Sequence, residues 1–557
     1  MNKTKNILNK KAFLNLKSYT INLINKNPKL IILIFGVLIF GFSILNGFVW
    51  DDEEQVVNNI YIRSLSNVPE FFTQSTFNTG GAAQLSGMYY KPIMTVFFSI
   101  VYLFSGVNAW GYHIVQLGFH ILNAVLVYLI FKHFFKQKIG LFLSLIFLVH
   151  PGNSETVLYV SALQDVLYMF FGLLTFYLVI RKKELEMFDW VFVGALLLLS
   201  LLGKETGILF IPIIFVYFLF FNKQALVGYL KTSLLVIATY FIMRLGIAQI
   251  AISHNKLASI MRADLLTRLQ TIPLVITFYL FLFILPFRLA VSQHWLTTKP
   301  TWDSFYLPIV IILTFVCLVI LFGYTLYQKQ TKFFKPYLLF SFIFFIALGL
   351  HSQIIVLDMT VAERWFYLML FGLLGMVGVV LCESKKFFYK QQKTLIVIGL
   401  VILLIFAGKS FSRTLEWRDG LTLFTKDQAI AAGNYDFENN LGVYLYRAGK
   451  INQAQKHYLK SVRIAPHWTT NWNNLAVTYE IEGKQKKAAQ AYLKAINNGD
   501  YYLAYENYAG LLIKQKKYQQ AKQFLEKQAI PRFPYNQKLR EMYIYIRSQK
   551  SKVKNIT

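Results

Sequence analysis

Long apolar runs dominate the first three quarters of the chain and alternate with short polar connectors. The first run, Ile31 to Trp50, is about 20 residues long, which is enough for a helix to cross a hydrocarbon core of roughly 30 Å. Backbone groups cannot stay unpaired in lipid, and the runs are too long for barrel strands, so the pattern predicts transmembrane helices. Further runs lie at 110–131, 138–150, 158–180, 188–202, 206–221, 226–250, 269–290, 305–327, 335–351, 361–381 and 393–409.

The apolar pattern ends at Lys409, and the rest of the chain is polar, basic and helical in its periodicity. Small and aromatic residues recur there at a spacing of about 34, which is typical of tetratricopeptide (TPR) repeats. Each TPR helix pair must stack on the next to bury its apolar face; unrelated amphipathic helices are the alternative. The recurring residues are Leu441, Gly442, Leu445, Ala454, Tyr458 and Pro466, then Leu475, Ala476, Tyr479, Ala488, Tyr492 and Asp500, then Ala509, Leu512, Ala521 and Leu525.

The two patterns predict an all-α protein in which a polytopic transmembrane bundle precedes a C-terminal TPR α-solenoid. We expect about 11 crossings and about three repeats. Residues 1–29 form a basic cytoplasmic N-terminus, and 30–410 form the membrane domain, whose first external loop is 51–109. Residues 411–434 are a junction, and 435–557 are the repeats.

Composition and charge agree with this division. The chain is 56% hydrophobic and 15% charged, whereas a water-soluble domain is typically about 25% charged. The net charge of +30 comes from short clusters between apolar runs, which argues against nucleic-acid binding. Cys317 and Cys382 are far apart in apolar runs, so a disulfide framework and a cysteine-based metal site are excluded.

The connectors predict how the bundle is oriented, because Lys-rich and Arg-rich loops remain cytoplasmic. The seven lysines of residues 1–29 precede an uncleaved first span, since no signal-peptide cleavage pattern follows them. Between Lys223 and Lys335, both placed inside, three apolar runs occur where parity requires an even number, so either one run, such as 269–290, is re-entrant or the count is wrong. The basic connectors are 132–138, 181–183, 328–335 and 385–393, and the acidic ones are 51–90, 150–157, 203–206 and 357–364.

This orientation leaves the repeats outside the cytoplasm. We expect a multi-pass plasma (inner) membrane protein with an external or periplasmic TPR domain, or an ER membrane protein with a lumenal one if the source is eukaryotic. The bilayer is therefore one partner, and nucleic acid is not expected to be another.

Four consecutive acids, Asp51 to Glu54, follow the first apolar run directly. They can be read as a solvated helix end, as a site for Mg²⁺ or Mn²⁺, or as the position of a general base that meets a lipid-linked substrate. No other cofactor is indicated.

Further ionisable residues stand at the ends of apolar runs on the same predicted side. Singly, each is more often structural, but several gathered on one side of a bundle indicate function. A phosphate at the membrane surface needs cations, and transfer of a sugar to a hydroxyl needs a carboxylate base. The residues are Lys91, His150, Glu155, Asp165, Lys204, Glu205, Glu363 and Arg364.

An ordered set of short motifs resembles one family. The chain is similar to the transmembrane and TPR-containing O-mannosyltransferases and their bacterial relatives, which are GT-C glycosyltransferases that use polyprenyl phosphate sugars. The resemblance covers about residue 30 to residue 545, and it is the order of the motifs that makes it specific. The motifs are Gly47-Phe48-Val49-Trp50-Asp51-Asp52, Tyr90-Lys91-Pro92, Gly111-Tyr112-His113 through His120-Ile121-Leu122-Asn123-Ala124, Leu148-Val149-His150-Pro151 with Glu155, Gly203-Lys204-Glu205, Val361-Ala362-Glu363-Arg364-Trp365 and Glu416-Trp417-Arg418-Asp419.

The resemblance implies roles for these residues. Asp51 would be the catalytic base of an inverting transfer and Asp52 its acidic neighbour. Cations would hold the phosphate of the lipid-linked sugar. The family more often has Arg at the position of Lys91, and a Lys ammonium cannot make the bidentate contact that an Arg guanidinium makes. The phosphate-binding residues would be Lys91, Lys204, Arg364 and His150, and the supporting residues Glu155, Glu205, Glu363 and His294.

The function that follows is transfer of a sugar, mannose by the resemblance, to a protein hydroxyl, with the repeats binding the acceptor polypeptide or a partner protein. Two alternatives stay open: a GT-C enzyme that glycosylates a lipid or a cell-envelope glycan, and a non-catalytic membrane-anchored TPR scaffold. Retention of the acidic and basic set favours an enzyme. A transporter is not supported, because no inverted repeat of discontinuous helices is evident.

Overall fold

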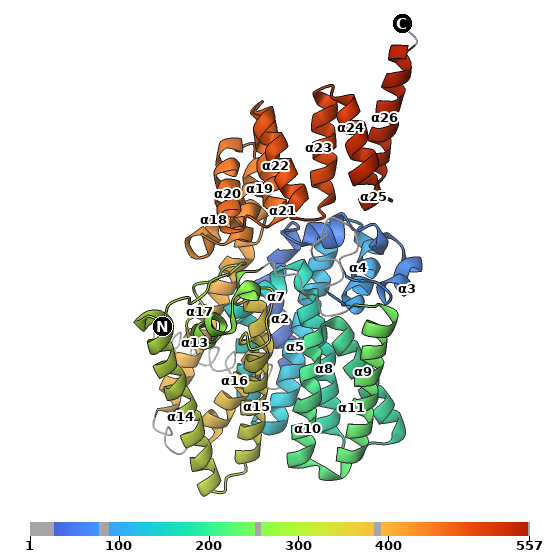
Figure 1. Ribbon diagram of the computed structural model, residues 1–557. Helices are drawn as coiled ribbons and strands as arrows, with labels where there is room; N and C mark the ends of the chain where they lie inside the picture. Colours follow the sequence, from blue (N-terminus) through green and yellow to red (C-terminus); the bar gives the residue numbers. More distant parts are fainter. Residues whose placement is uncertain (1–26, 77–88, 251–257, 384–390, 555–557) are drawn as a thin grey trace, which may run out of the picture.

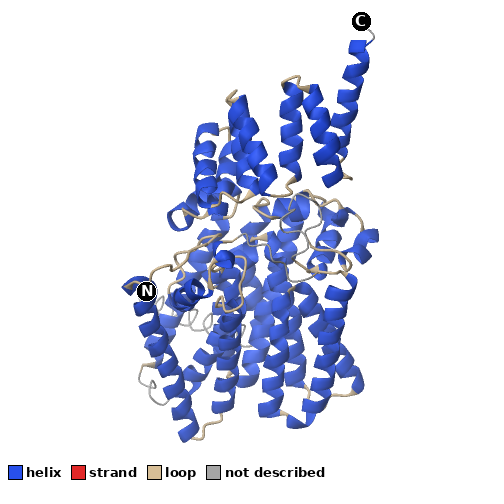
Figure 2. Cartoon of the chain, in the orientation of Figure 1, coloured by secondary structure: helices blue, strands red, loops and turns tan. Residues whose placement is uncertain are grey.

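The computed structural model describes residues 27–76, 89–250, 258–383 and 391–554. Long helices form a bundle, and a stack of shorter helix pairs stands on one of its ends (Figure 1). Helices and loops make up the described part, where the only extended pairing is an isolated bridge between Gln293 and Val361 (Figure 2). The predicted fold class, an all-α membrane bundle followed by a TPR solenoid, is confirmed. The segment 1–26, with most of the predicted basic N-terminus, lies outside the described residues, as does most of connector 385–393.

Nine helices in the described part are long and apolar enough to cross a membrane, or ten if α6 and the short helices after it, bent by 52°, count as one span. Shorter apolar helices complete the bundle: α9 packs on α8 and α11, and α10 packs on α11 and α15. The helices are α2 (Pro28–Phe40), α4 (Pro92–Ser105), α5 (Ala109–Phe134), α6 (Gln137–Val149), α7 (Ser154–Leu158), α8 (Leu163–Arg181), α9 (Met187–Gly203), α10 (Phe210–Phe221), α11 (Leu226–Phe241), α13 (Leu265–Ile284), α14 (Leu307–Gln328), α15 (Phe334–His351), α16 (Phe366–Glu383) and α17 (Gln392–Glu416).

Helix α13 begins and ends at the end of the bundle that carries the repeats. Before it, Arg262 hydrogen-bonds His467 of the repeats; after it, the backbone N–H of Val291 donates to Asp427 at 2.9 Å. Helix α14 then runs to the opposite end (Figure 1). Of the three apolar runs between Lys223 and Lys335, those in α11 and α14 therefore connect the two ends of the bundle, whereas the run in α13 does not. Two crossings between these lysines are an even number, as their predicted location on the same side requires.

Close packing on α15 positions α16, which directly follows the short helical turn Glu363–Trp365 that carries Arg364. A Cβ atom at Gly372 would come within 2.6 Å of the Phe344 backbone nitrogen, and one at Gly375 within 2.1 Å of the Phe340 ring. Only glycine permits this approach, as is common where helices pack in membranes.

The solenoid contains three consecutive helix pairs, as the 34-residue period predicts. The alanines of the period, such as Ala454, Ala488 and Ala521, are fully buried where the helices of a pair cross. The pairs are α19 (Tyr435–Arg447) with α20 (Ile451–Ile464), α21 (Thr469–Ile481) with α22 (Gln485–Asn498), and α23 (Tyr502–Lys514) with α24 (Tyr518–Phe524); α18 (Gly420–Ala431) precedes them, and α25 (Ile530–Arg532) and α26 (Gln537–Lys554) follow.

A buried ion network joins the two domains at the junction. The Arg413 guanidinium donates to both oxygens of Asp427, at 2.5 and 2.8 Å, and to Glu416 at 2.9 Å. Arg413 is 1% exposed. Because Asp427 also accepts from Val291 of the membrane domain, this network holds the helix Gly420–Ala431, which precedes the first repeat, against the bundle.

Candidate active site

A polar cavity of about 500 Å³ lies between the loops at one end of the bundle and the first repeats. Both domains supply its walls. From the membrane domain they include Trp50, Asp51, Glu53, Glu54, Tyr89, Lys91, Tyr159, Ser161, Gln164, His294, Asp358 and Arg364, and from the repeats Tyr435, Asp436, Asn439, Asn440, Arg447, Trp468, Asn474, Tyr501 and Tyr502.

Asp51 reaches the cavity from a strained turn. Trp50 before it has a φ of 56°, a conformation that is unfavourable for a bulky side chain and is found where structure over-determines it. The Trp50 ring stacks on Tyr159 at 5.5 Å, and its backbone N–H donates to the Tyr444 hydroxyl of α19 at 2.8 Å. The turn that aims Asp51 is thus held partly by the repeat domain.

Asp52 has a different position from its neighbour. It is fully buried and does not line the cavity. Its carboxylate accepts from the backbone N–H and the hydroxyl of Ser161, both at 2.7 Å, and from the backbone N–H of Val49 at 3.0 Å. These bonds tie the Asp51 turn to the short helical turn just before α8, so Asp52 holds the Asp51 turn in place and does not face the cavity.

Burial raises the pKa of Asp51 from 3.8 to about 6, although the Tyr159 hydroxyl and the Arg364 charge oppose the shift. A carboxyl group with such a pKa is ionised at neutral pH and is more basic than an exposed aspartate. It is therefore suited to take a proton from a hydroxyl.

The shift predicts a pH dependence of turnover. Only the ionised carboxylate can act as base, so kcat/KM, which reports the pKa values of the free enzyme, should fall about tenfold per pH unit below about pH 6 and level off between about pH 6 and 7.5. The check is kcat/KM between pH 4.5 and 7.5, with intrinsic fluorescence monitoring the fold at each pH. A profile that stays flat down to pH 5 contradicts a base with this pKa.

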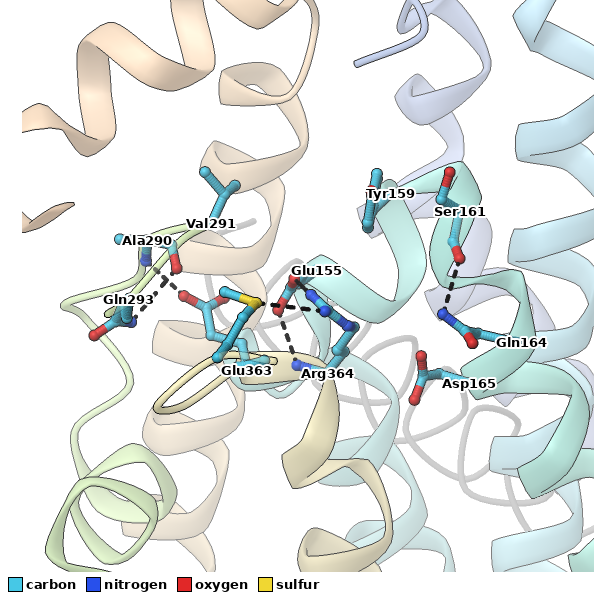
Figure 3. Close-up of polar contacts among 12 residues, drawn as sticks. Glu155, Tyr159, Ser161, Gln164, Asp165, Ala290, Val291, Gln293, Glu363 and Arg364 are labelled. Carbon is cyan, nitrogen blue, oxygen red and sulfur yellow. Dashed lines mark hydrogen bonds and ion pairs between the residues drawn. The ribbon is translucent and has the colours of Figure 1, made fainter. Parts of the chain in front are cut away.

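Two cations face the same cavity as Asp51. The Lys91 ammonium lies 4.3 Å from the centre of the Tyr89 ring, makes no ion pair among the described residues, and has a pKa lowered by burial to about 8. Arg364 is paired with Glu155, which also accepts from the Arg364 backbone N–H at 3.0 Å (Figure 3). The cavity therefore combines a carboxylate with positive charge that can meet a phosphate.

The other predicted phosphate-binding residues do not line the cavity. Lys204 is paired with Asp165 at 2.5 Å. His150 packs among phenylalanine rings and hydrogen-bonds the backbone oxygen of Phe283. Because neither side chain belongs to the cavity lining, their part in phosphate binding stays a prediction.

The supporting residues are also divided by the structure. Glu205 pairs with Arg244 at 2.7 Å, away from the cavity lining. Glu363 accepts from the backbone N–H of Ala290 at 2.6 Å (Figure 3). Both hold segments of the membrane domain together, whereas Glu155 orients a cavity residue, Arg364.

His294 lines the cavity at the contact between the domains. Its Nε2 lies 3.1 Å from an Asp436 oxygen in α19, and its backbone N–H donates to Asn434. The prediction that His294 belongs to the substrate side stays open. Its position couples the loop after α13 to the first repeat.

Several cavity residues were not predicted from the sequence. The Tyr89 hydroxyl donates to Asp358 at 2.5 Å, and this pair closes one wall; Asp358 lies in connector 357–364, whose acidic character was the available signal. The asparagines of α19 and α21 also went unnoticed, although they recur at the repeat spacing. Among the residues that the structure describes, no three His, Cys, Asp or Glu side chains form a group suited to a metal ion, so a divalent cation stays a prediction.

Known proteins share both domains. A family model described as dolichyl-phosphate-mannose-protein mannosyltransferase matches residues 90–252, and a tetratricopeptide repeat model matches residues 469–498. Protein O-mannosyl-transferase F38B6.6 of Caenorhabditis elegans is 24% identical over 79% of this chain and 63% of its own length. Human protein O-mannosyl-transferase TMTC3 is 25% identical over 85% of this chain and 55% of its own length.

A shorter match has a higher identity: human protein O-mannosyl-transferase TMTC1 is 32% identical over 34% of this chain and 23% of its own length. The chain thus spans about half to two thirds of the length of the C. elegans protein and of human TMTC3. These similarities confirm the resemblance to the TPR-containing O-mannosyltransferases that the motifs indicate.

Proposed function

We propose that this protein transfers a sugar, mannose by analogy with its relatives, from a polyprenyl phosphate to a hydroxyl of a polypeptide. One observation carries the proposal: Asp51, Lys91 and Arg364 face a single cavity that both domains enclose. The names of the relatives support the reaction class.

The geometry suggests how the residues divide the work. Asp51 takes the proton of the acceptor hydroxyl, whose oxygen attacks the anomeric carbon of the sugar. The bond from that carbon to the phosphate oxygen breaks, and polyprenyl phosphate leaves. Lys91 and Arg364 stabilise the charge that grows on this phosphate. Attack opposite the leaving phosphate inverts the anomeric carbon without a covalent enzyme intermediate.

An apolar groove supports a lipid-linked substrate. It has a volume of about 650 Å³ and is lined almost wholly by apolar side chains of α13 to α16, Phe283 among them. The His150 ring stacks on Phe283, and the short helix that follows His150 carries Glu155, the partner of Arg364. A prenyl chain in this groove would bring its phosphate towards Arg364.

The sidedness in this proposal follows from the basic connectors. Lys335 donates to the backbone oxygen of Phe220 at 3.1 Å, so the connectors after α10 and α14 meet, and they lie at the end away from the repeats (Figure 1). With this end cytoplasmic, the cavity and repeats face the periplasm or exterior of a plasma membrane, or the lumen of an ER membrane. A cysteine placed in α22 should then react with an impermeant maleimide only from that side.

The reaction can be tested with purified protein in lipid nanodiscs. It would be incubated with polyprenyl phosphate mannose, glucose or N-acetylglucosamine and with threonine-containing peptides. We expect release of polyprenyl phosphate and a peptide heavier by one sugar. Absence of release with every lipid-linked sugar would refute the enzymatic function and favour a scaffold, whereas release with transfer only to a glycan would favour the cell-envelope alternative.

Lys91 gives a sharper test of the phosphate contact. Replacing it with Met removes the charge and keeps the apolar stem, so kcat/KM for the polyprenyl phosphate sugar should fall about tenfold to a hundredfold, the value of one charge-assisted hydrogen bond. Lys91→Arg restores the cation and should remain close to wild type. Equal kcat/KM values for the Met and Arg variants would exclude Lys91 from phosphate binding.

A further inference from the structure

The inner helices of the repeats carry a connected row of asparagines. Asn439 in α19, Asn473 in α21 and Asn507 in α23 stand at the repeat spacing. Asn474 donates to the Asn439 oxygen at 2.9 Å, and Asn507 donates to the Asn473 oxygen at 3.0 Å. Amide side chains thus link three successive repeats along one surface of the solenoid.

A second pair of asparagines, one residue further on, faces the cavity that contains Asp51. Asn440 and Asn474 both line it and are partly exposed. The Asn440 oxygen accepts from Asn439 and the Asn474 oxygen from Asn473, so the buried Asn439 and Asn473 orient the partly exposed pair. Among the described residues, the Asn440 amide nitrogen has no hydrogen-bond partner.

These exposed amides suit a polypeptide main chain. A primary amide offers two N–H donors and a carbonyl acceptor, which complement the C=O and N–H of a peptide group. An extended segment leaves its peptide groups unpaired and rises about 3.3 Å per residue, so groups about three residues apart can meet neighbouring repeats, whose helices lie about 8–10 Å apart. Contacts to the main chain hold a segment whatever its side chains are, as in other modes of extended-peptide recognition.

We propose that Asn440 and Asn474 hold the main chain of an extended acceptor segment, and that this places a Ser or Thr hydroxyl of the segment at Asp51. The inference rests on the proposed function and specifies its acceptor as an extended stretch recognised through its backbone. We call the surface formed by Asn440 and Asn474 the peptide track. Arg447 of α19 pairs with Glu53, two residues beyond Asp51, and this pair keeps the peptide track aligned with Asp51.

The test compares wild type with the double variant Asn440→Ala/Asn474→Ala, both as full-length protein in nanodiscs. The probe is a fluorescein-labelled peptide of repeated Thr-Val units, together with the same peptide N-methylated around its central threonine. The matched control is Asn497→Ala, because Asn497 is an exposed asparagine of α22 that does not line the cavity. Three quantities are measured: peptide binding by anisotropy, transfer to the peptide, and hydrolysis of the lipid-linked sugar by water.

The double variant should bind the peptide about tenfold to a hundredfold more weakly, the loss of two hydrogen bonds, with KM for the peptide raised by the same factor. Hydrolysis of the lipid-linked sugar should be unchanged, since water needs no track. The N-methylated peptide should bind wild type weakly and be insensitive to the substitutions.

Other outcomes separate this inference from the proposed function. If peptide binding depends on Asn440 and Asn474 but wild type transfers no sugar, the peptide-binding proposal is supported and the enzymatic function is refuted. Unchanged peptide binding and KM in the double variant overturn the track while transfer itself remains. Transfer to glycans with no peptide binding also overturns the track.

Discussion

Asp51→Asn should lower kcat by roughly two to four orders of magnitude, the usual contribution of a positioned general base. Asn keeps the shape of the side chain but cannot accept a proton. The substrates should still bind, so KM for the lipid-linked sugar should change little. The measurement is initial-rate kinetics with polyprenyl phosphate mannose and a threonine peptide.

Stability distinguishes this result from misfolding. The pKa of Asp51 in the folded protein, about 6, lies above its ordinary value of 3.8, so the folded protein holds the proton more tightly than the unfolded chain does. Above pH 6 the ionised carboxylate therefore costs stability, and Asp51→Asn should not lower the melting temperature. The control is Glu70→Gln, because Glu70 is an exposed acid of the same loop. This substitution should change neither kcat nor the melting temperature. Wild-type kcat in Asp51→Asn would rule out Asp51 as the base.

Arg413→Gln should destabilise the protein by about 3–5 kcal/mol, the usual cost of breaking a buried ion pair from one side. The substitution strips the bidentate contact from Asp427 and leaves a buried carboxylate without its cation. Because Asp427 also holds the loop after α13, the junction between the domains should loosen first. Thermal unfolding in nanodiscs, with a fluorophore on α18, would show this as an early transition.

The matched control lies five residues further along. Arg418 pairs with Asp419 at 3.1 Å, but both side chains are exposed, so Arg418→Gln should change stability by less than about 1 kcal/mol. Equal losses in the two variants would show that burial of the Arg413 network does not stabilise the junction.

The bundle and the repeats could be predicted from sequence because each has its own period. Apolar runs long enough for a bilayer indicated the spans, and the 34-residue spacing indicated the helix pairs. The behaviour of 269–290 could not be decided this way, since hydrophobicity is the same for a helix that crosses and one that returns. Only contacts on both sides of α13, at Arg262 and Val291, settle it.

The candidate site was predictable in part. Asp51, Lys91 and Arg364 were singled out as ionisable residues at the ends of spans, and they do face one cavity. Lys204 is also an ionisable residue at the end of a span, yet it pairs with Asp165. This ion pair forms because α8 packs on α9, and the hydrophobic pattern of the sequence does not show that packing. The repeat-domain wall could not be expected from composition, because docking of two separate domains creates it.

The cavity meets the solenoid only as far as Leu503, at the start of α23. The helices from α24 onward contribute nothing to its walls. Addition of helix pairs at this distal end would therefore lengthen the solenoid surface and leave the cavity with Asp51, Lys91 and Arg364 unchanged. Chains of this architecture can thus differ in the length of the repeat surface, and in the polypeptides that bind to it, through repeat number alone, while the residues of the cavity stay the same.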